Sequence, residues 1–275
     1  MKLTLLGTGC SSIDYKRCGS SNLVFTKKTK ILIDCGSGVT QRLNQSGNSS
    51  ADVDALLLTH LHTDHVIDLY QLIMSSWHSD RDSIWKIYGP KGTKEFVDKI
   101  FLAWKSERKL RVSYEKRKSI KALKYKVYEF NKKGTIRMND IKIKYFEVNH
   151  KTVEYAYGFS FFNDNKKLTI SGDTRPCENL MQNALHSDVL LHEVFIEYEM
   201  NKLSKLRTKK THHAVKEYHT PSNLVGKVAK LSNCNRLVLT HFVPTKFNTS
   251  KLKRRVKKDF GKDPIIGKDL LTINI

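Results

Sequence analysis

Short apolar runs separated by glycine and asparagine turns fill the first third of the chain. Continuous or alternating apolar residues over four to seven positions are typical of strands, whereas apolar residues three and four apart are typical of helices. These patterns predict strands over residues 2–6, 21–26, 30–34, 55–59 and 84–88. They predict helices over residues 39–45, 66–77 and 94–104.

The rest of the chain repeats this mixture. Apolar runs predict strands over residues 141–148, 159–162, 168–170, 189–191 and 237–240, and helical spacing predicts a helix over 222–231. No internal repeat, low-complexity block or linker interrupts the pattern. Strands and helices that alternate in both halves of 275 residues favour an α/β fold built as one domain over residues 1–275.

A dense group of possible metal ligands follows the strand expected at 55–59. It reads His60-Leu61-His62-Thr63-Asp64-His65. His60, His62 and Asp64 alternate, so in an extended segment they share one side, and His65 follows where the chain turns into a helix. Zinc prefers imidazole nitrogen and carboxylate oxygen, and a catalytic site leaves a position for water. The cluster therefore predicts a metal centre.

Three further candidates each follow a predicted strand. His150 comes after residues 141–148, Asp173 after 168–170, and His241 after 237–240. Four side chains cannot fill two catalytic zinc sites, and strand ends of α/β folds gather at one edge. We therefore expect His150, Asp173 and His241 to join the cluster at His60.

The charge balance raises the question of a polyanionic partner. Lys and Arg number 49 against 27 Asp and Glu, a formal charge of +22, with basic residues concentrated at 105–126, 202–210 and 251–258. Such a field would attract nucleic acid. A general bias towards lysine, with ordinary solvated faces, explains the same composition, because lysines are spread over the whole chain. Both interpretations remain open.

Cysteine usage and hydropathy exclude several classes. The five cysteines are odd in number and form no Cys-x-x-Cys pair, which argues against a disulfide framework and against a cysteine-ligated zinc site. No apolar run approaches the roughly 20 residues of a membrane span. The first residues read as a strand and a glycine turn, not as a signal peptide. We expect a cytoplasmic protein that does not enter membranes.

Several segments together resemble the metallo-β-lactamase superfamily, and within it the ribonuclease Z group. The matching segments are Leu6-Gly7-Thr8-Gly9, Ile33-Asp34-Cys35-Gly36, the histidine cluster, Tyr88-Gly89-Pro90, His150, Gly172-Asp173-Thr174-Arg175-Pro176-Cys177, Leu191-His192-Glu193, His219-Thr220, Leu239-Thr240-His241-Phe242 and Gly267-Lys268-Asp269-Leu270. The resemblance spans almost the whole chain. It implies a four-layer αβ/βα sandwich.

The resemblance also implies a division of the metal ligands. His60, His62 and His150 correspond to the ligands of one zinc, Asp64, His65 and His241 to those of the other, and Asp173 to the bridging carboxylate. Two Zn²⁺ per chain are implied, with Mn²⁺ or Fe²⁺ as possible substitutes. Two such ions lower the pKa of a shared water and neutralise charge on a phosphodiester.

Further roles follow from the same resemblance. Asp64 corresponds to a residue that orients or deprotonates the nucleophile. His219, oriented by Glu193, corresponds to a proton donor for the leaving oxygen; a supporting or helix-capping role for His219 and simple structural support by Glu193 are the alternatives. Asp34 is interpreted as a partner that fixes a ligand imidazole, or as an ordinary turn aspartate.

One departure from the ribonuclease Z pattern concerns the substrate. From position 150 to position 173 the chain advances only 23 positions, which leaves no room for the arm that ribonuclease Z enzymes commonly use to grip tRNA. The basic stretch 105–126, with Trp104, Tyr114 and Tyr125, could provide another grip or could be a solvated insertion. Arg175 could contact a substrate phosphate or form a structural ion pair.

Three functions follow from these observations. The first is a zinc-dependent endoribonuclease of ribonuclease Z type that removes 3′ trailers from precursor tRNA by metal-bound hydroxide. The second is a phosphodiesterase or arylsulfatase-like hydrolase of small phosphate or sulfate esters. The third is a nucleic-acid-binding protein without catalysis, which the full ligand set disfavours. By analogy with the resembling family, we expect a homodimer.

Overall fold

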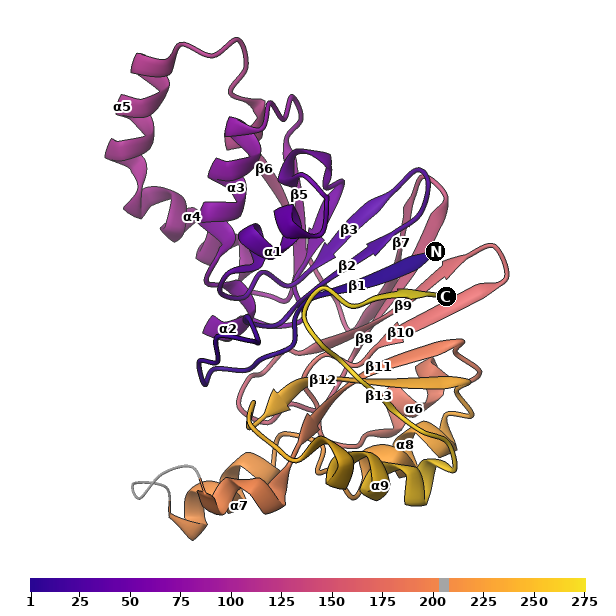
Figure 1. Ribbon diagram of the computed structural model, residues 1–275. Coiled ribbons are helices and arrows are strands. Elements are labelled where there is room, and N and C mark those ends of the chain that lie inside the picture. The colour runs from indigo at the N-terminus through magenta and orange to yellow at the C-terminus, as the bar shows by residue number, and fades with distance from the viewer. Residues whose placement is uncertain (203–207) are drawn as a thin grey trace.

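Two seven-stranded sheets pack face to face in the computed structural model, which describes residues 1–202 and 208–275. Helices cover the outer face of each sheet (Figure 1). This arrangement confirms the α/β sandwich expected from the sequence. Residues 203–207, and with them most of the basic stretch expected at 202–210, lie outside the described residues.

The first sheet contains both ends of the chain. Its strands, in spatial order, are β14 (Thr272–Asn274), β1 (Lys2–Gly7), β2 (Ser21–Phe25), β3 (Lys30–Ile33), β4 (Ala55–Leu57), β5 (Trp85–Gly89) and β6 (Tyr125–Glu129). From β3 to β6 the strands are parallel. The carboxyl ends of β3, β4 and β5 therefore meet at one edge, where the His60 segment begins.

The second sheet carries the later site residues. Its strands are β13 (Ile265–Ile266), β12 (Arg236–Val243), β11 (Val189–Phe195), β10 (Lys166–Ile170), β9 (Tyr157–Asn163), β8 (Ile141–Glu147) and β7 (Lys133–Met138). The run from β10 to β13 is parallel, and the run from β7 to β10 is antiparallel. Asp173 follows β10, and His150 follows β8.

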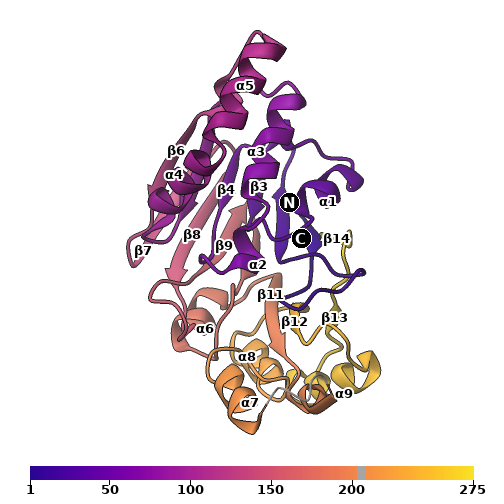
Figure 2. The same ribbon diagram turned by 90° about the vertical axis from the view of Figure 1, so that its left-hand side faces the viewer.

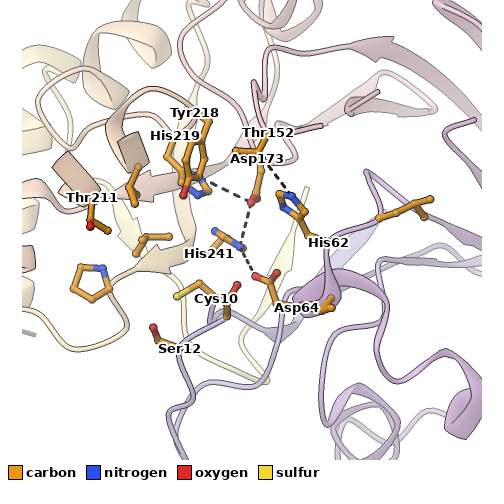
Figure 3. Close-up of a pocket in the computed structure, with 16 residues that line it drawn as sticks. Cys10, Ser12, His62, Asp64, Thr152, Asp173, Thr211, Tyr218, His219 and His241 are labelled. Carbon is orange, nitrogen blue, oxygen red and sulfur yellow. Dashed lines mark hydrogen bonds and ion pairs between the residues drawn. The ribbon is translucent and has the colours of Figure 1, made fainter. Parts of the chain in front are cut away.

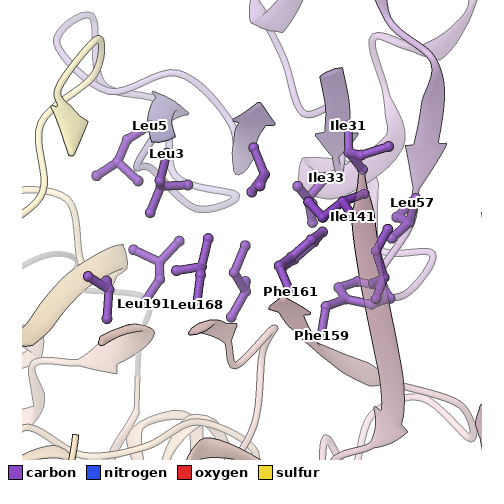
Figure 4. Packing of buried hydrophobic residues seen from close by; sticks show 14 of the residues in the cluster. Leu3, Leu5, Ile31, Ile33, Leu57, Ile141, Phe159, Phe161, Leu168 and Leu191 are labelled. Carbon is purple, nitrogen blue, oxygen red and sulfur yellow. The ribbon is translucent and has the colours of Figure 1, made fainter. Parts of the chain in front are cut away.

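The main core lies between the two sheets. Leu3, Ile33 and Leu57 of the first sheet face Phe159 and Leu191 of the second, and all five side chains are fully buried (Figure 4). Burial of this size stabilises the sandwich by roughly 1.5–3 kcal/mol for each large side chain. The two sheets are thereby held in a fixed relation, and so are the ligand segments at their shared edge.

Helices form the outer layers. Over the first sheet lie α1 (Val39–Gln45), α2 (Thr63–Val66), α3 (Leu69–His78) and α4 (Thr93–Ala103), with the short turns η1 (Ser50–Asp52) and η2 (Lys121–Leu123), and α5 (Lys105–Glu115) follows α4. Over the second lie α6 (Glu178–Ala184), α8 (Val225–Leu231) and α9 (Thr249–Phe260). The segments η3 (Glu197–Lys202) and α7 (Lys209–Lys216) project beside the second sheet, and α5 projects beside the first (Figures 1 and 2).

Most predicted elements are present, with one instructive difference. The helix expected over 66–77 is present as α3 but begins three residues later, because Ile67 and Asp68 separate it from the short helix α2 that ends at Val66. The Asp68 amide donates to the carbonyl of Cys35, and the Asp68 carboxylate accepts the Thr40 amide at 2.8 Å. These tertiary bonds accompany the end of α2 at Val66, one residue after His65. Within the described residues, no helix combines the length and apolar character needed to cross a membrane.

Candidate metal centre

The first three histidines of the predicted set meet at one point. The Nδ1 atom of His62 lies 3.0 Å from His60 Nε2 and 3.3 Å from His150 Nε2. Ligand atoms of these three side chains all lie within 4.8 Å of one another. His60 and His150 are buried, and His62 is half-buried at the wall of a cleft. Three imidazole nitrogens gathered in this way can hold one divalent ion.

A second group lies beside the first. Asp64 Oδ2 is 3.2 Å from His241 Nε2 and 3.8 Å from His65 Nε2. Asp173 Oδ2 is 3.3 Å from His241 Nε2, 3.5 Å from His65 Nε2 and 4.0 Å from His60 Nε2. The carboxylate of Asp173 therefore touches both groups. Figure 3 shows the dashed contacts that join His241 to Asp64 and to Asp173.

Local backbone geometry aims two of these ligands. Gly172 has φ +60°, and a Cβ there would lie 2.5 Å from the Tyr157 carbonyl, so only glycine allows the turn that presents Asp173. The sequence predicts that His241 follows its strand. In the structure, His241 instead lies inside β12, with φ +42°. The β11–β12 register skips it, because Thr240 pairs with Glu193 and Phe242 with Val194. A bulge of this kind redirects the extra side chain into the site.

Each of three ligand imidazoles has one nitrogen held by the protein. His65 Nδ1 lies 2.7 Å from Asp34 Oδ2, His60 Nδ1 lies 3.0 Å from Thr59 Oγ1, and His150 Nδ1 lies 2.8 Å from the Tyr218 carbonyl. Such contacts fix the tautomer of a metal ligand and leave the other nitrogen for the ion. The remaining nitrogen of His65 is buried without a hydrogen-bond partner among the described residues. The donor set therefore fits divalent metal ions.

Electrostatics favour the ligating form of five of the seven donors; for His65, burial opposes protonation but Asp173 and Asp34 raise the pKa. Burial lowers the pKa of His60, His62 and His150, which favours neutral imidazole. Burial opposes ionisation of Asp64 and Asp173, yet the neighbouring histidines outweigh it and hold both carboxyl pKa values below their usual range. Neutral imidazoles and ionised carboxylates are the forms that bind metal.

His219 and Glu193 lie beside the ligands as a pair. His219 Nδ1 is 3.2 Å from Glu193 Oε1 and 3.9 Å from Asp173 Oδ2. Glu193 Oε1 also accepts the Thr220 amide at 2.8 Å, which fixes the carboxylate. Burial opposes protonation of His219, but the charge and hydrogen bond of Glu193 raise its pKa. The pair can hold a proton at the edge of the metal centre. His192 instead turns its Nδ1 to the Glu193 carbonyl, 2.7 Å away.

The ligands open into a cleft of about 560 Å³. Its walls come from the loop after β1, the His62 segment, α7 and the end of β12. Lining residues include Ser11, Leu61, Thr152, Val215, and Pro244. The described lining residues include no lysine or arginine. Sequence reasoning did not identify these walls, because they belong to loops and to a helix without a motif.

A residue near the chain terminus holds the loop that forms one wall. Asp269 accepts the Thr8 amide at 3.0 Å and the Cys18 amide at 2.7 Å, and Arg42 lies 3.3 Å from the same carboxylate. Thr59, which sequence reasoning also missed, donates its amide to Asp34 at 2.8 Å. Asp269 lies within a family-like segment, whereas Thr59 precedes the histidine cluster and has no such signal.

The basic stretch 105–126 forms helix α5, turn η2 and the start of β6. Several of its charges are paired, for example Arg111 with Glu107 and Lys121 with Asp82. Trp104 stacks on Tyr70 with a centroid distance of 5.2 Å, and the Tyr125 hydroxyl donates to Asp98. Of the three aromatic residues predicted for stacking, Tyr114 is the most exposed, with 83% of its surface accessible.

Arg175 also has a protein partner. Its guanidinium lies 3.7 Å from Glu217, whose carboxylate also binds Lys151 at 2.7 Å. Arg175 does not line the cleft over the ligands. The geometry therefore agrees with the ion-pair alternative for this residue.

Comparisons with known proteins place these features in a family. Residues 1–220 match the family described as "Anti-Pycsar protein Apyc1". Ribonuclease Z of Mycobacterium bovis is 30% identical over 247 residues, which cover 89% of this chain and 86% of the relative. The structure of human tRNase Z, short form, superposes with a TM-score of 0.72 at 22% identity, over 100% of this chain and 99% of that chain.

A third similarity concerns the fold alone. A diphosphatase of the PhnP family has a TM-score of 0.73 at 16% identity, over 100% of this chain and 97% of that chain. Together with the histidine and aspartate groups, these similarities support a metal-dependent hydrolase of the nuclease or phosphodiesterase type. The chain belongs to the metallo-β-lactamase superfamily, to its ribonuclease Z-like part, and there to the family described as Anti-Pycsar protein Apyc1.

Proposed function

We propose that this protein hydrolyses phosphodiester bonds of RNA in the manner of ribonuclease Z, with two zinc ions per chain. The observation that carries the proposal is the pair of donor groups that share Asp173. His60, His62 and His150 form one group, and Asp64, His65 and His241 form the other. Nitrogen and oxygen donors without cysteine suit zinc, and Mn²⁺ or Fe²⁺ could replace it.

The ions would supply an activated water and neutralise phosphate charge when bound. The chain's own residues would do the rest. Asp64, at the cleft wall, would orient the nucleophile through its second carboxylate oxygen. His219, held by Glu193, would give a proton to the leaving oxygen, because Glu193 raises the pKa of the imidazole and so favours its protonated form. Removal of 3′ trailers from precursor tRNA is the specific reaction proposed, by analogy with the ribonuclease Z relatives.

A second candidate is hydrolysis of a small phosphodiester or of an aryl sulfate. Three observations favour it. Only a short turn and the β9–β10 hairpin connect His150 to Asp173, so no arm is present there. In addition, the described cleft lining lacks the lysines and arginines that commonly grip a polyanion. The matched family's description names opposition to Pycsar, not tRNA maturation, and this too leaves a smaller substrate open.

A homodimer is part of the proposal. Large apolar side chains are exposed just after α2, on α5 and on the loop after β1, including Ile13 (96% exposed), Tyr15 (82%), Ile67 (61%) and Leu110 (60%). These elements share the face that is turned to the viewer in Figure 2. Exposed apolar surface on one face favours association of two copies. Light scattering of the purified protein would test this, and a monomer at micromolar concentration would contradict it.

One set of assays separates the candidates. Zinc-loaded protein should be tested on a precursor tRNA with a 3′ trailer, on bis-p-nitrophenyl phosphate and on p-nitrophenyl sulfate. The proposal expects cleavage of the precursor and of the phosphodiester. An intact precursor beside a hydrolysed small ester would refute the tRNA assignment and support the second candidate.

Variants test the metal centre itself. His62→Ala and Asp173→Ala should each abolish turnover and lower the bound zinc, because each removes a donor from the groups described above. His78→Ala changes a histidine that hydrogen-bonds Glu115 on the surface and serves as the matched control. Full activity in either ligand variant would contradict the two-metal proposal.

A further inference from the structure

A second cavity opens beside the cleft over the metal ligands. This cavity, which we name the side groove, has a volume of about 360 Å³ and is lined by Leu61, Pro90, Lys91, Gly92, Val153 and Tyr155, with Glu154 at its rim. Leu61 lines both cavities. The side groove therefore adjoins the cleft at Leu61, and a molecule too long for the cleft can extend towards it.

Both walls of the side groove continue directly from metal ligands. Leu61 lies between His60 and His62, and an atom at the Cβ position of Gly92 would be 3.7 Å from Leu61 Cδ1, which is ordinary packing contact. The opposite wall is the turn after His150, whose carbonyl accepts the Val153 amide at 3.0 Å. The side groove is therefore held in a fixed position relative to the ligands.

Two side chains give the side groove its chemistry. Lys91 is exposed, and its Nζ lies 5.9 Å from the centroid of the half-buried Tyr155 ring. Among the described residues, no carboxylate forms an ion pair with Lys91. A free cation next to an aromatic face is the combination by which proteins bind single-stranded nucleic acid, with the cation at phosphate and the ring under a base.

The other charges nearby are already engaged. Lys94 is paired with Asp98, and Lys99 with Glu95. The Glu129 carboxylate accepts the amides of Gly92 and Lys94 at 3.0 and 2.9 Å, so it caps the first turn of α4. Glu154 interacts with the Tyr155 hydroxyl at the rim. Lys91 is thus the cation of this groove that remains available for a ligand.

We propose that the side groove binds the single-stranded segment of RNA next to the scissile phosphodiester, with Lys91 at a phosphate and Tyr155 stacked on a base. The inference rests on the proposed phosphodiesterase function and adds the groove that would hold the strand beside the scissile bond. Lys91 and Tyr155 do not line the cleft over the ligands, so turnover of a small diester bound there is not expected to need them. A polynucleotide chain must leave the cleft, and the side groove offers it a cation and an aromatic platform.

The experiment compares two substrates in the full-length zinc-loaded protein. Lys91→Ala and Tyr155→Leu should each lower kcat/KM for a single-stranded oligoribonucleotide by at least about fivefold, the lower end of what one base–aromatic stack contributes. Neither variant should change kcat/KM for bis-p-nitrophenyl phosphate. Lys253→Ala, which removes an exposed charge of α9, is the matched control and should leave both substrates unaffected. Tyr155→Phe keeps the ring and should behave as wild type.

A binding measurement removes the dependence on turnover. Fluorescence anisotropy of a labelled oligoribonucleotide with chelator-treated protein should show weaker binding for Lys91→Ala. The slope of the logarithm of the binding constant against the logarithm of the salt concentration should become shallower by about 0.7. This is the value for one phosphate contact on a single strand. If bis-p-nitrophenyl phosphate is hydrolysed while both variants bind and cleave the oligonucleotide like wild type, the side-groove inference is wrong. If no phosphodiester is hydrolysed at all, the proposed function itself fails.

Discussion

Replacing Asp34 by asparagine tests whether the metal centre depends on residues that never touch the ion. Asp34 Oδ2 lies 2.7 Å from His65 Nδ1, and Oδ1 accepts the Thr59 amide at 2.8 Å. An asparagine fits the same space and tolerates the φ of +58° at this position. Its amide nitrogen, however, is a donor and cannot accept a proton from His65 Nδ1. The proton would move to Nε2, the atom that faces the site.

The size of the effect follows from that change of tautomer. Loss of a partner that orients a ligand imidazole costs about 10- to 100-fold in metal affinity or activity, which is about 1.4–2.7 kcal/mol. We expect Asp34→Asn to bind zinc more weakly by this factor in competition with a fluorescent chelator. Its rate on bis-p-nitrophenyl phosphate should fall at limiting zinc and recover partly when zinc is raised.

The control is Asp54→Asn, because Asp54 accepts the Lys30 amide at 2.8 Å in the same sheet and contacts no ligand. It should leave zinc affinity and turnover unchanged. If Asp34→Asn retains wild-type zinc affinity and rate at limiting metal, the contact with His65 does not position the imidazole. The reasoning from tautomer to affinity would then be refuted.

Three further outcomes are expected. Removal of metal by a chelator should abolish turnover and lower Tm. Zinc added at about 100 times its Kd should restore about 2.7 kcal/mol of stability. An unchanged Tm would argue against a metal held by these buried donors. His219→Ala should lower kcat at least about 100-fold with zinc content unchanged, as measured by metal analysis, whereas loss of zinc would mark His219 as a ligand instead of a proton donor. Asp269→Ala should lower the free energy of unfolding in urea by about 3–5 kcal/mol, because it leaves Arg42 and the amides of the loop after β1 without their buried acceptor. A decrease below about 1 kcal/mol would contradict that role.

The sequence by itself determined the sandwich and the seven predicted ligands. Strand periodicity located β1, β2, β3 and β8 closely, because their buried faces require apolar residues at regular spacing. Most of the ligands were recognisable because they lie in short segments that directly follow predicted strands, whereas His241 lies within β12. The structure brings all seven together, although the functional roles assigned to them remain proposals.

Tertiary structure alone decided how those residues are held and what surrounds them. The bulge that turns His241 inward depends on its pairing with β11, and the contact of Asp34 with His65 joins residues 31 positions apart. The cleft wall at Val215 and the side groove at Lys91 and Tyr155 are formed by loops and by a helix without periodic pattern. Spacing along the chain carries no information about such contacts, because they arise only when two sheets pack and bring distant loops to one edge.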